Sequence, residues 1–216
     1  MVSLIKLYAV TITYEDPRYE HSGDIQDVTE QVLKSPTASN KRFLVPRGGV
    51  LQADYEISLD TGQPVSVAAT VQAIVDAQNS LPVGGRFGVY QRGDAFHVVP
   101  VAARDSKGAW VEQRSILDTP ITLSCAEMNG IELIDAILKQ VKDASGVELG
   151  LSGTGFANIL RRYKGSVAAT GEPARDVLMR TLHSISPRFT WLLLYDPQLH
   201  LYVFNLAFAA ERPGFR

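Results

Sequence analysis

The stretch that decides the fold is TLSCAEMNGIELIDAILKQVKDASGVELGL, residues 122–151. Its central part places apolar side chains in a single stripe at helical spacing, namely Ile131, Ile134, Ile137, Leu138 and Val141. Asn129 is a favoured residue at a helix start, and Gly146 at a helix end. Residues 121–125 and 147–151 have the composition of strands. We therefore predict a strand, a helix and a second strand in that order.

The same kind of pattern continues to residue 208. After a loop at 152–155 we predict an extended segment over 159–168. Gly171 and Pro173 then open a second helix, whose apolar face holds Val177, Leu178, Leu182 and Ile185. Two strands, 189–195 and 200–208, are predicted to close as a hairpin. The predicted order is strand, helix, strand, strand, helix, strand, strand.

The first half of the chain also mixes helix and strand signals. Apolar residues at helical spacing predict a helix over 65–79, and a short turn at Gly93 and Asp94 predicts a hairpin of 87–92 with 95–101. Residues 110–117 predict one further strand. The alternation at the start of the chain, residues 1–13, also favours a strand.

The most regular alternation lies in residues 51–60, where Leu51, Ala53, Tyr55, Ile57 and Leu59 alternate with polar residues. This pattern predicts a strand with one face in solvent. A turn over 46–49 precedes it and contains proline and glycine. We predict that this turn joins the strand to residues 42–45 in a hairpin.

These elements together predict an α+β protein of two small units, each with helices packed on a short sheet, mostly antiparallel or mixed. A turn sequence at residues 118–120 suggests units of 1–118 and 119–216. A helix followed by a hairpin occurs in both halves, so the units are expected to be similarly built. Either a repeat or convergence on a common α+β arrangement would explain this.

Composition limits the classes of function. The 216 residues are 45% hydrophobic and 20% charged, with a net charge of −2. Residues 1–119 hold 11 basic and 14 acidic residues, and residues 120–216 hold 10 and 9, so neither half is a polycation. We therefore expect no nucleic-acid partner. No run approaches the roughly 20 apolar residues that span a bilayer, so we expect no membrane-spanning segment.

Residues suited to catalysis are scattered in the sequence. Cys125 is the single cysteine, which excludes an intramolecular disulfide and a cysteine-rich metal site. The four histidines, His21, His97, His183 and His200, form no metal-binding motif. A nucleophile elbow at Ser152 would need glycine at position 154, where the chain has Thr154. We expect no catalytic residues, no metal and no cofactor, and therefore not an enzyme.

An acidic stretch lies near the start of the chain and consists of Glu15, Asp16, Glu20, Asp24, Asp27 and Glu30, with only Arg18 against it. Pro17 and Gly23 indicate an irregular segment. We predict a solvated surface loop. Calcium binding is the alternative, because carboxylate oxygens are its usual ligands.

The predicted closing hairpin is rich in aromatic residues and supplies the candidate binding residues, Trp191, Tyr195, Tyr202 and Phe204. It holds more large side chains than one face of a small sheet needs, so some could contact a partner. The competing interpretation is core packing, because both alternating sets in residues 189–195 are largely apolar.

Three features of residues 122–208 resemble the STN domain, the short N-terminal module of secretins and TonB-dependent receptors. The strand and helix that end at Gly146, with residues 147–151, resemble its opening elements; residues 165–182 resemble its following strand, glycine and helix; and residues 189–208 resemble its closing hairpin. The resemblance implies a periplasmic module that contacts secretion subunits or transmembrane regulators, with no active site.

The chain departs from that family in a longer connection at 152–158 and in having no pore or barrel after the module. It also resembles secreted bacterial proteins with a W-x-L-x-Y-D-P hairpin, here Trp191, Leu193, Tyr195, Asp196 and Pro197. That second likeness implies no activity.

We expect a non-enzymatic protein-interaction module of the bacterial cell envelope, periplasmic or secreted; residues 1–13 lack the features of a secretory signal, and whether one has been removed ahead of them stays open. The alternative is a small-ligand or glycan-binding protein with its site in the cleft between the units. A third class, a hydrolase, would require the fold to bring its residues together. A flat exposed strand edge would favour a protein partner, whereas a deep apolar pocket would favour a small ligand.

Overall fold

The structure is a computed structural model that describes residues 11–32, 42–48, 51–54, 56, 58, 66–153 and 155–209. Helices and both mixed and antiparallel sheets are present, so the predicted α+β class is confirmed. Among the described residues, unit 1 comprises 11–15, 115–153, 155–194 and 201–209. Unit 2 comprises the described residues between 16 and 114, together with 195–200.

These compact units are not consecutive halves of the chain. The N-terminal strand belongs with the C-terminal half in unit 1, and the tip of the closing hairpin, residues 195–200, belongs to unit 2. The observed division therefore differs from the predicted one at residues 118 and 119. The reason is that strand pairing joins residues far apart in the sequence, which local turn signals do not report.

Unit 1 contains the seven predicted elements in the predicted order, together with three further elements. Its elements are β1 (Thr11–Glu15), η3 (Ile116–Asp118), β7 (Pro120–Asn129), α4 (Gly130–Ser145), β8 (Leu149–Leu151), α5 (Ala157–Arg162), β9 (Lys164–Pro173), α6 (Ala174–Ile185), β10 (Phe189–Asp196) and β11 (Leu201–Phe208). The closing hairpin β10–β11 and the helices α4 and α6 occur where the sequence predicts them.

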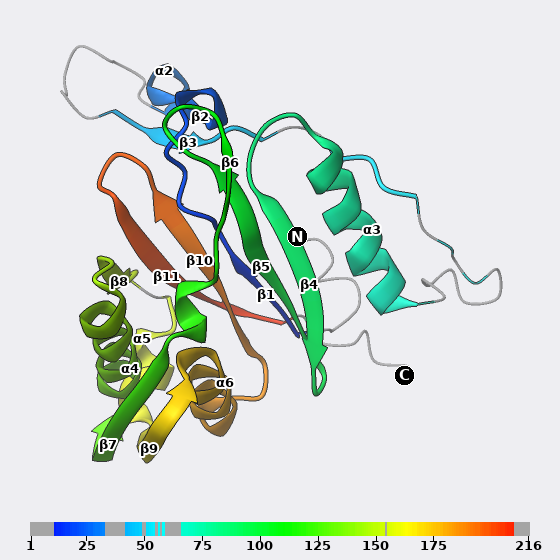
Figure 1. The fold of residues 1–216 in the computed structure, drawn as a ribbon. Coiled ribbons are helices and arrows are strands. Elements are labelled where there is room, and N and C mark those ends of the chain that lie inside the picture. The colour runs from blue at the N-terminus through cyan, green and yellow to red at the C-terminus, as the bar shows by residue number, and fades with distance from the viewer. Residues whose placement is uncertain are drawn as a thin grey trace. The chain divides into compact units, whose positions relative to one another are not determined.

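Two sheets enclose the helices of unit 1. The larger has the strand order β1, β10, β11, β8, in which β1 runs parallel to β10 and β8 runs parallel to β11. The smaller is an antiparallel ribbon of β7 and β9. Helix α4 contacts both β7 of the ribbon and β8 of the larger sheet, and α6 contacts β9 and α4 (Figure 1). The helices thus form the middle of a layered unit.

Local signals explain why α4 begins and ends where predicted. The Asn129 side chain accepts hydrogen bonds from the backbone N–H groups of Ile131 and Glu132, and Glu132 in turn accepts from the Asn129 N–H. This is a capping box, which satisfies donors at the helix start. At the other end Gly146 takes a left-handed conformation with φ of 70°, which glycine adopts without steric cost.

The predicted extended segment at 159–168 is wrong in its first part. Residues 157–162 form the short helix α5, and only from Lys164 does the chain become strand β9. Leu160 is fully buried in a unit where α5 packs against α4. Tertiary packing of this one apolar side chain outweighs the extended preference inferred from the local sequence.

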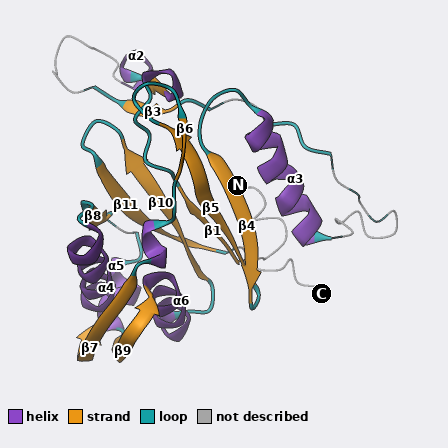
Figure 2. Ribbon diagram, in the orientation of Figure 1, coloured by secondary structure: helices purple, strands orange, loops and turns teal. Residues whose placement is uncertain are grey.

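Unit 2 contains a group of strands with one long helix beside them (Figure 2). Its elements are η1 (Ser22–Asp24), β2 (Ile25–Asp27), α2 (Thr29–Val32), β3 (Leu44–Pro46), α3 (Val67–Ser80), β4 (Arg86–Arg92), β5 (Ala95–Arg104) and β6 (Trp110–Glu112). Strands β4, β5 and β6 form an antiparallel meander, and β2 pairs with β3. The predicted helix at 65–79 and the hairpin around Gly93 are confirmed.

The predicted strand at 51–60 is not found in its described residues, 51–54, 56 and 58, which have no regular secondary structure. The rest of that segment lies outside the described residues. The predicted hairpin with 42–45 is also wrong, because β3 pairs with β2 instead. An alternating pattern fits a strand only if a partner is in reach, and it does not identify that partner.

Two further predicted strands, at 110–117 and 1–13, differ in how far the structure supports them. Strand β6 is shorter than the predicted 110–117, since residues 116–118 form the 3₁₀ helix η3. Within the predicted strand at 1–13, only residues 11–13 are described, and these lie in β1.

The helix-plus-hairpin segments of the two units are packed differently. Helix α3 contacts its own following strand β4, and the Asn79 side chain bonds both the N–H and the carbonyl of Phe87 on that strand. Helix α6 instead makes its main contacts with α4 and β9. These different environments favour convergence over a repeat as the reason for the similar element order.

Candidate functional site

The four candidate binding residues on the closing hairpin are all buried. Trp191 and Phe204 have no exposed surface, and Tyr195 and Tyr202 are almost fully covered. The Trp191 and Phe204 rings are stacked with centroids 5.8 Å apart. The Tyr195 hydroxyl lies 3.2 Å from His200 Nδ1. Because a partner cannot contact covered side chains, the structure corrects the binding interpretation and assigns these residues to the core.

The acidic stretch is also unlike the solvated loop that its charge predicts. Glu15, Asp16 and Asp24 are buried, and each accepts hydrogen bonds from groups far away in the sequence. Asp16 accepts from the Tyr195 backbone N–H at 3.0 Å. Asp24 accepts from the Gly84 N–H at 2.6 Å and from the Arg104 Nε at 2.9 Å. These carboxylates therefore stabilise the fold, because buried charges need paired partners.

Histidine and acidic residues gather into no metal site within the part of the chain that the structure describes, where no group of three or more metal-ligating side chains occurs. His97 packs beside Tyr90 with ring centroids 5.1 Å apart, while His183 lies on α6. His200 adopts a positive φ at the turn between β10 and β11. The described helices likewise include none with the length and apolar character of a membrane-spanning helix.

A buried ionic network is the main polar feature of unit 1. Arg175 on α6 and Glu15 on β1 form an ion pair, and the side chains of both are 1% exposed. The Ser115 hydroxyl donates to Glu15 and accepts from Arg175 Nη2 at 2.7 Å. Arg175 also donates to Asp118 at 3.1 Å and 3.2 Å. Sequence analysis did not single out Arg175 or Ser115, because their partners lie 160 and 100 residues from them in the chain.

The groups of this network are engaged with one another and stabilise the fold. Burial raises the pKa of Glu15, and the nearby Arg175 charge partly opposes that rise. Ser115 is buried and has its oxygen occupied by Arg175 and by the Leu117 N–H at 3.0 Å. Its hydroxyl is therefore unavailable as a nucleophile toward a substrate. What the network does is tie strand β1, η3 and helix α6 together.

The β7–β9 ribbon offers the most regular exposed surface of unit 1. Its inner face is apolar and buried at Ile121, Val167 and Ala169. Its outer face is exposed and carries small side chains along residues 122–126 and 166–170, namely Thr122, Ser124, Ala126, Ser166, Ala168 and Thr170. Register pairs Thr122 with Thr170 and Ser124 with Ala168, so these residues form two matched rows. Within these two described stretches no bulky side chain stands on this face.

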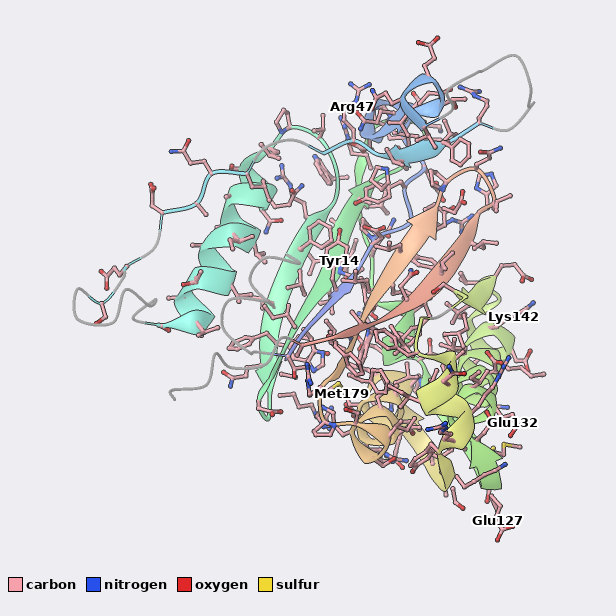
Figure 3. All side chains as sticks on the ribbon, turned by 180° about the vertical axis from the view of Figure 1, so that it is seen from behind. Tyr14, Arg47, Glu127, Glu132, Lys142 and Met179 are labelled. Atoms are coloured by element: carbon pink, nitrogen blue, oxygen red, sulfur yellow. The ribbon has the colours of Figure 1, made fainter. Side chains whose placement is uncertain are left out.

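The two edges of the ribbon differ. Along β9, the Arg180 side chain of α6 donates to the Ala168 carbonyl and pairs with Glu172. Along β7, residues 121–125 receive no comparable cover from a side chain in the described part of the structure. Beyond them a bulge at residues 126–127 interrupts the register, and Glu127 points away from the unit at the end of the ribbon (Figure 3). The β7 edge is thus the more open one.

Comparison with known proteins does not identify a function, so the proposal below is argued from the geometry of the structure. No protein-family model matches the sequence, and no curated protein or solved structure matches it either. The STN resemblance stays a prediction from the sequence.

Proposed function

We propose that the protein is a non-enzymatic protein-interaction module of the bacterial cell envelope, and that it binds its partner along strand β7. The observation that carries this proposal is the separate β7–β9 ribbon. Among the described residues, neither strand pairs with a third strand. Each therefore has an outer row of backbone N–H and carbonyl groups, and such a row is a template for an added strand.

The surface of the ribbon suits this mode of binding. Its small outer side chains let a partner backbone approach closely, and the helix α4 behind β7 holds the strand in place. In strand addition, backbone hydrogen bonds supply affinity and side-chain pockets supply specificity. Because Arg180 already occupies part of the β9 edge, β7 is the preferred side.

The resemblance to the STN domain supports the envelope location and the kind of partner. The elements β7, α4, β8, β9, α6, β10 and β11 follow the order on which that resemblance rests, with α5 inserted between β8 and β9. That family's modules contact secretion subunits or transmembrane regulators. We therefore propose a protein of the envelope as the partner, with no catalytic step.

Site-specific photo-crosslinking in the native host tests this proposal. A photoreactive residue placed at Ser124, on the outer face of β7, should capture a protein of the envelope fraction. The matched control places it at Lys139, an exposed position on α4 of the same unit. An adduct from position 124 that is absent from position 139 is the expected result. Equal labelling at both positions, or none at 124 in a folded variant, contradicts the proposal.

A further inference from the structure

We propose that the Asn129–Gly130 dipeptide is a site of covalent modification, at which the folded protein blocks spontaneous deamidation and local unfolding permits it. The dipeptide lies where strand β7 ends and helix α4 begins. The reacting groups are the side-chain amide of Asn129 and the backbone nitrogen of Gly130. The inference does not rest on the proposed function, because the reaction needs no protein partner.

The reaction consumes water and needs no other co-reactant. The backbone nitrogen of Gly130 attacks Cγ of Asn129, the bond from Cγ to Nδ2 breaks, and the departing nitrogen takes up the Gly130 proton and leaves as ammonia. The product is a five-membered succinimide ring. Water then opens the ring at one of its two carbonyl carbons, which gives either aspartate or isoaspartate at position 129.

The sequence makes position 129 the most reactive asparagine of the unfolded chain. Glycine has no side chain, so it does not hinder the attack by its own backbone nitrogen. Each of the other asparagines, Asn40, Asn79, Asn158 and Asn205, is followed by a residue that has a side chain. Deamidation of the unfolded protein is therefore expected first at Asn129.

The fold needs both residues of this reactive pair. Asn129 caps α4, because its Oδ1 accepts hydrogen bonds from the N–H groups of Ile131 at 3.0 Å and Glu132 at 3.1 Å. Gly130 is buried, and a Cβ there would lie 3.0 Å from the Leu160 carbonyl oxygen and 3.2 Å from Leu160 Cα. A larger residue at position 130 would therefore press on α5.

The folded geometry prevents the ring from closing. Closure requires the Gly130 nitrogen to eclipse Cβ about the Cα–C bond of Asn129, but the observed ψ of 166° leaves these two atoms staggered. The two hydrogen bonds to Oδ1 hold the side-chain amide, and Glu132 accepts from the Asn129 N–H at 2.8 Å. Rotation into the reactive geometry therefore breaks the cap or displaces Gly130 from its packing against α5.

The two products affect the fold differently. Aspartate keeps a side-chain oxygen at the cap and adds a negative charge at the start of α4, where the helix dipole favours it. Isoaspartate inserts a methylene group into the main chain between β7 and α4, so the capping oxygen is displaced. A chain with isoaspartate at position 129 thus carries a lasting chemical record that this junction has opened.

Mass spectrometry of the intact chain tests the site. The protein is incubated at mildly alkaline pH, once folded and once unfolded in guanidinium chloride, and is then digested. The peptide that contains residues 129 and 130 is analysed for deamidation, and chromatography separates its aspartate and isoaspartate forms. We expect the reaction to be at least about tenfold slower in the folded protein, because the junction must first open locally.

Two variants test the role of the cap. Glu132→Ala removes one hydrogen bond of the capping box, so it should speed the reaction of the folded protein about two- to fivefold and leave the rate in guanidinium chloride unchanged. Asp143→Ala is the matched control, because it removes an exposed carboxylate from the other end of α4. Both of its rates should equal those of the wild type.

Three outcomes would overturn the inference. Equal rates in the folded and unfolded wild type would mean that the fold does not block the reaction. An unfolded chain that does not deamidate at Asn129 would mean that the dipeptide is not a modification site. Equal folded-state rates in the two variants would mean that the capping box does not control the reaction, with circular dichroism confirming that both are folded.

Discussion

At the scale of single residues, the burial of the Arg175–Glu15 ion pair has a large energetic consequence. The pair is completed by Ser115 and Asp118, so every charged group has hydrogen-bond partners. Breaking such a pair leaves an isolated buried charge, which costs far more than the intact pair contributes.

Arg175→Met should therefore lower the free energy of unfolding by about 3–5 kcal/mol. The methionine fills much of the volume but gives Glu15 no counter-charge. Urea unfolding followed by circular dichroism measures the change. The double variant Glu15→Met, Arg175→Met should recover much of the loss, since it removes both charges. A single variant as stable as the wild type would show that Glu15 finds another partner.

The pKa of Glu15 gives a prediction for pH. Burial raises this pKa above its ordinary value of 4.5, so the folded protein binds the proton more tightly than the unfolded chain does. The contribution of Glu15 to stability is then fully present below pH 4.5 and decreases as the pH rises through the folded-state pKa. Glu15→Gln should flatten the stability profile over that range, as measured by urea unfolding at a series of pH values. An identical slope in the variant would exclude this linkage.

An exposed carboxyl, Asp27, should show the opposite sign. Hydrogen bonds from Thr29 and Arg42 lower its pKa to about 2. Its contribution is present above the ordinary value of 3.8 and is lost as the pH falls toward 2. NMR chemical shifts of the β2–β3 residues should therefore change between pH 4 and pH 2 before the β4–β5 residues do. Simultaneous changes in both hairpins would contradict this.

At the scale of elements, α4 shows how far local sequence determines structure. Asn129→Ala removes the capping box and should cost about 1 kcal/mol, as measured by thermal unfolding. Gly146→Ala should also destabilise by about 1 kcal/mol, because alanine is strained at φ of 70°. A substitution of the partly exposed Gln140 by Ala is a suitable control. Equal stability of all three variants would mean that packing alone fixes the ends of α4.

A substitution in the closing hairpin tests whether Trp191 is a core residue or a partner-binding residue. Trp191 is fully buried and stacked on Phe204, so Trp191→Ala should cost about 3–5 kcal/mol of stability. Chemical unfolding would detect this loss directly. A variant with wild-type stability and a lost partner would restore the interface interpretation.

The elements also show what sequence can and cannot predict here. The helices α3, α4 and α6 and the hairpins β4–β5 and β10–β11 were predictable because their caps, stripes and turns are local. The pairing of β2 with β3 was not, because nothing in residues 25–27 identifies a partner at 44–46. The start of strand β9 was not predictable either, because residues 157–162 form a helix in which Leu160 is buried.

The candidate sites were harder still to predict. The aromatic residues drew attention to the closing hairpin, but a core strand and an interface strand can have the same aromatic content. The small side chains of the β7–β9 face were visible in the sequence, but only the register shows that they form one surface.

At the scale of the whole molecule, unit 1 is built from segments of both ends of the chain, and this should affect the stability of a fragment. A fragment of residues 119–216 lacks β1 and Ser115, so β10 loses its parallel partner and Arg175 loses Glu15. We expect this fragment to unfold at lower temperature than the full chain and its β10 amides to exchange faster. A peptide of residues 8–18 added in trans should slow that exchange. A fragment with protected β10 amides and no response to the peptide would contradict this.

The pairing of β1 with β10 also sets an order of events during synthesis. Thr190 donates to the Ile12 carbonyl across 178 residues of sequence, so the first strand leaves the ribosome long before its partner exists. The β4–β6 meander is complete by residue 112 and can form while translation continues. The edge of the N-terminal strand that pairs with β10 must wait until the last quarter of the chain is made. A chaperone that shields this strand in the nascent chain would therefore raise the yield of folded protein.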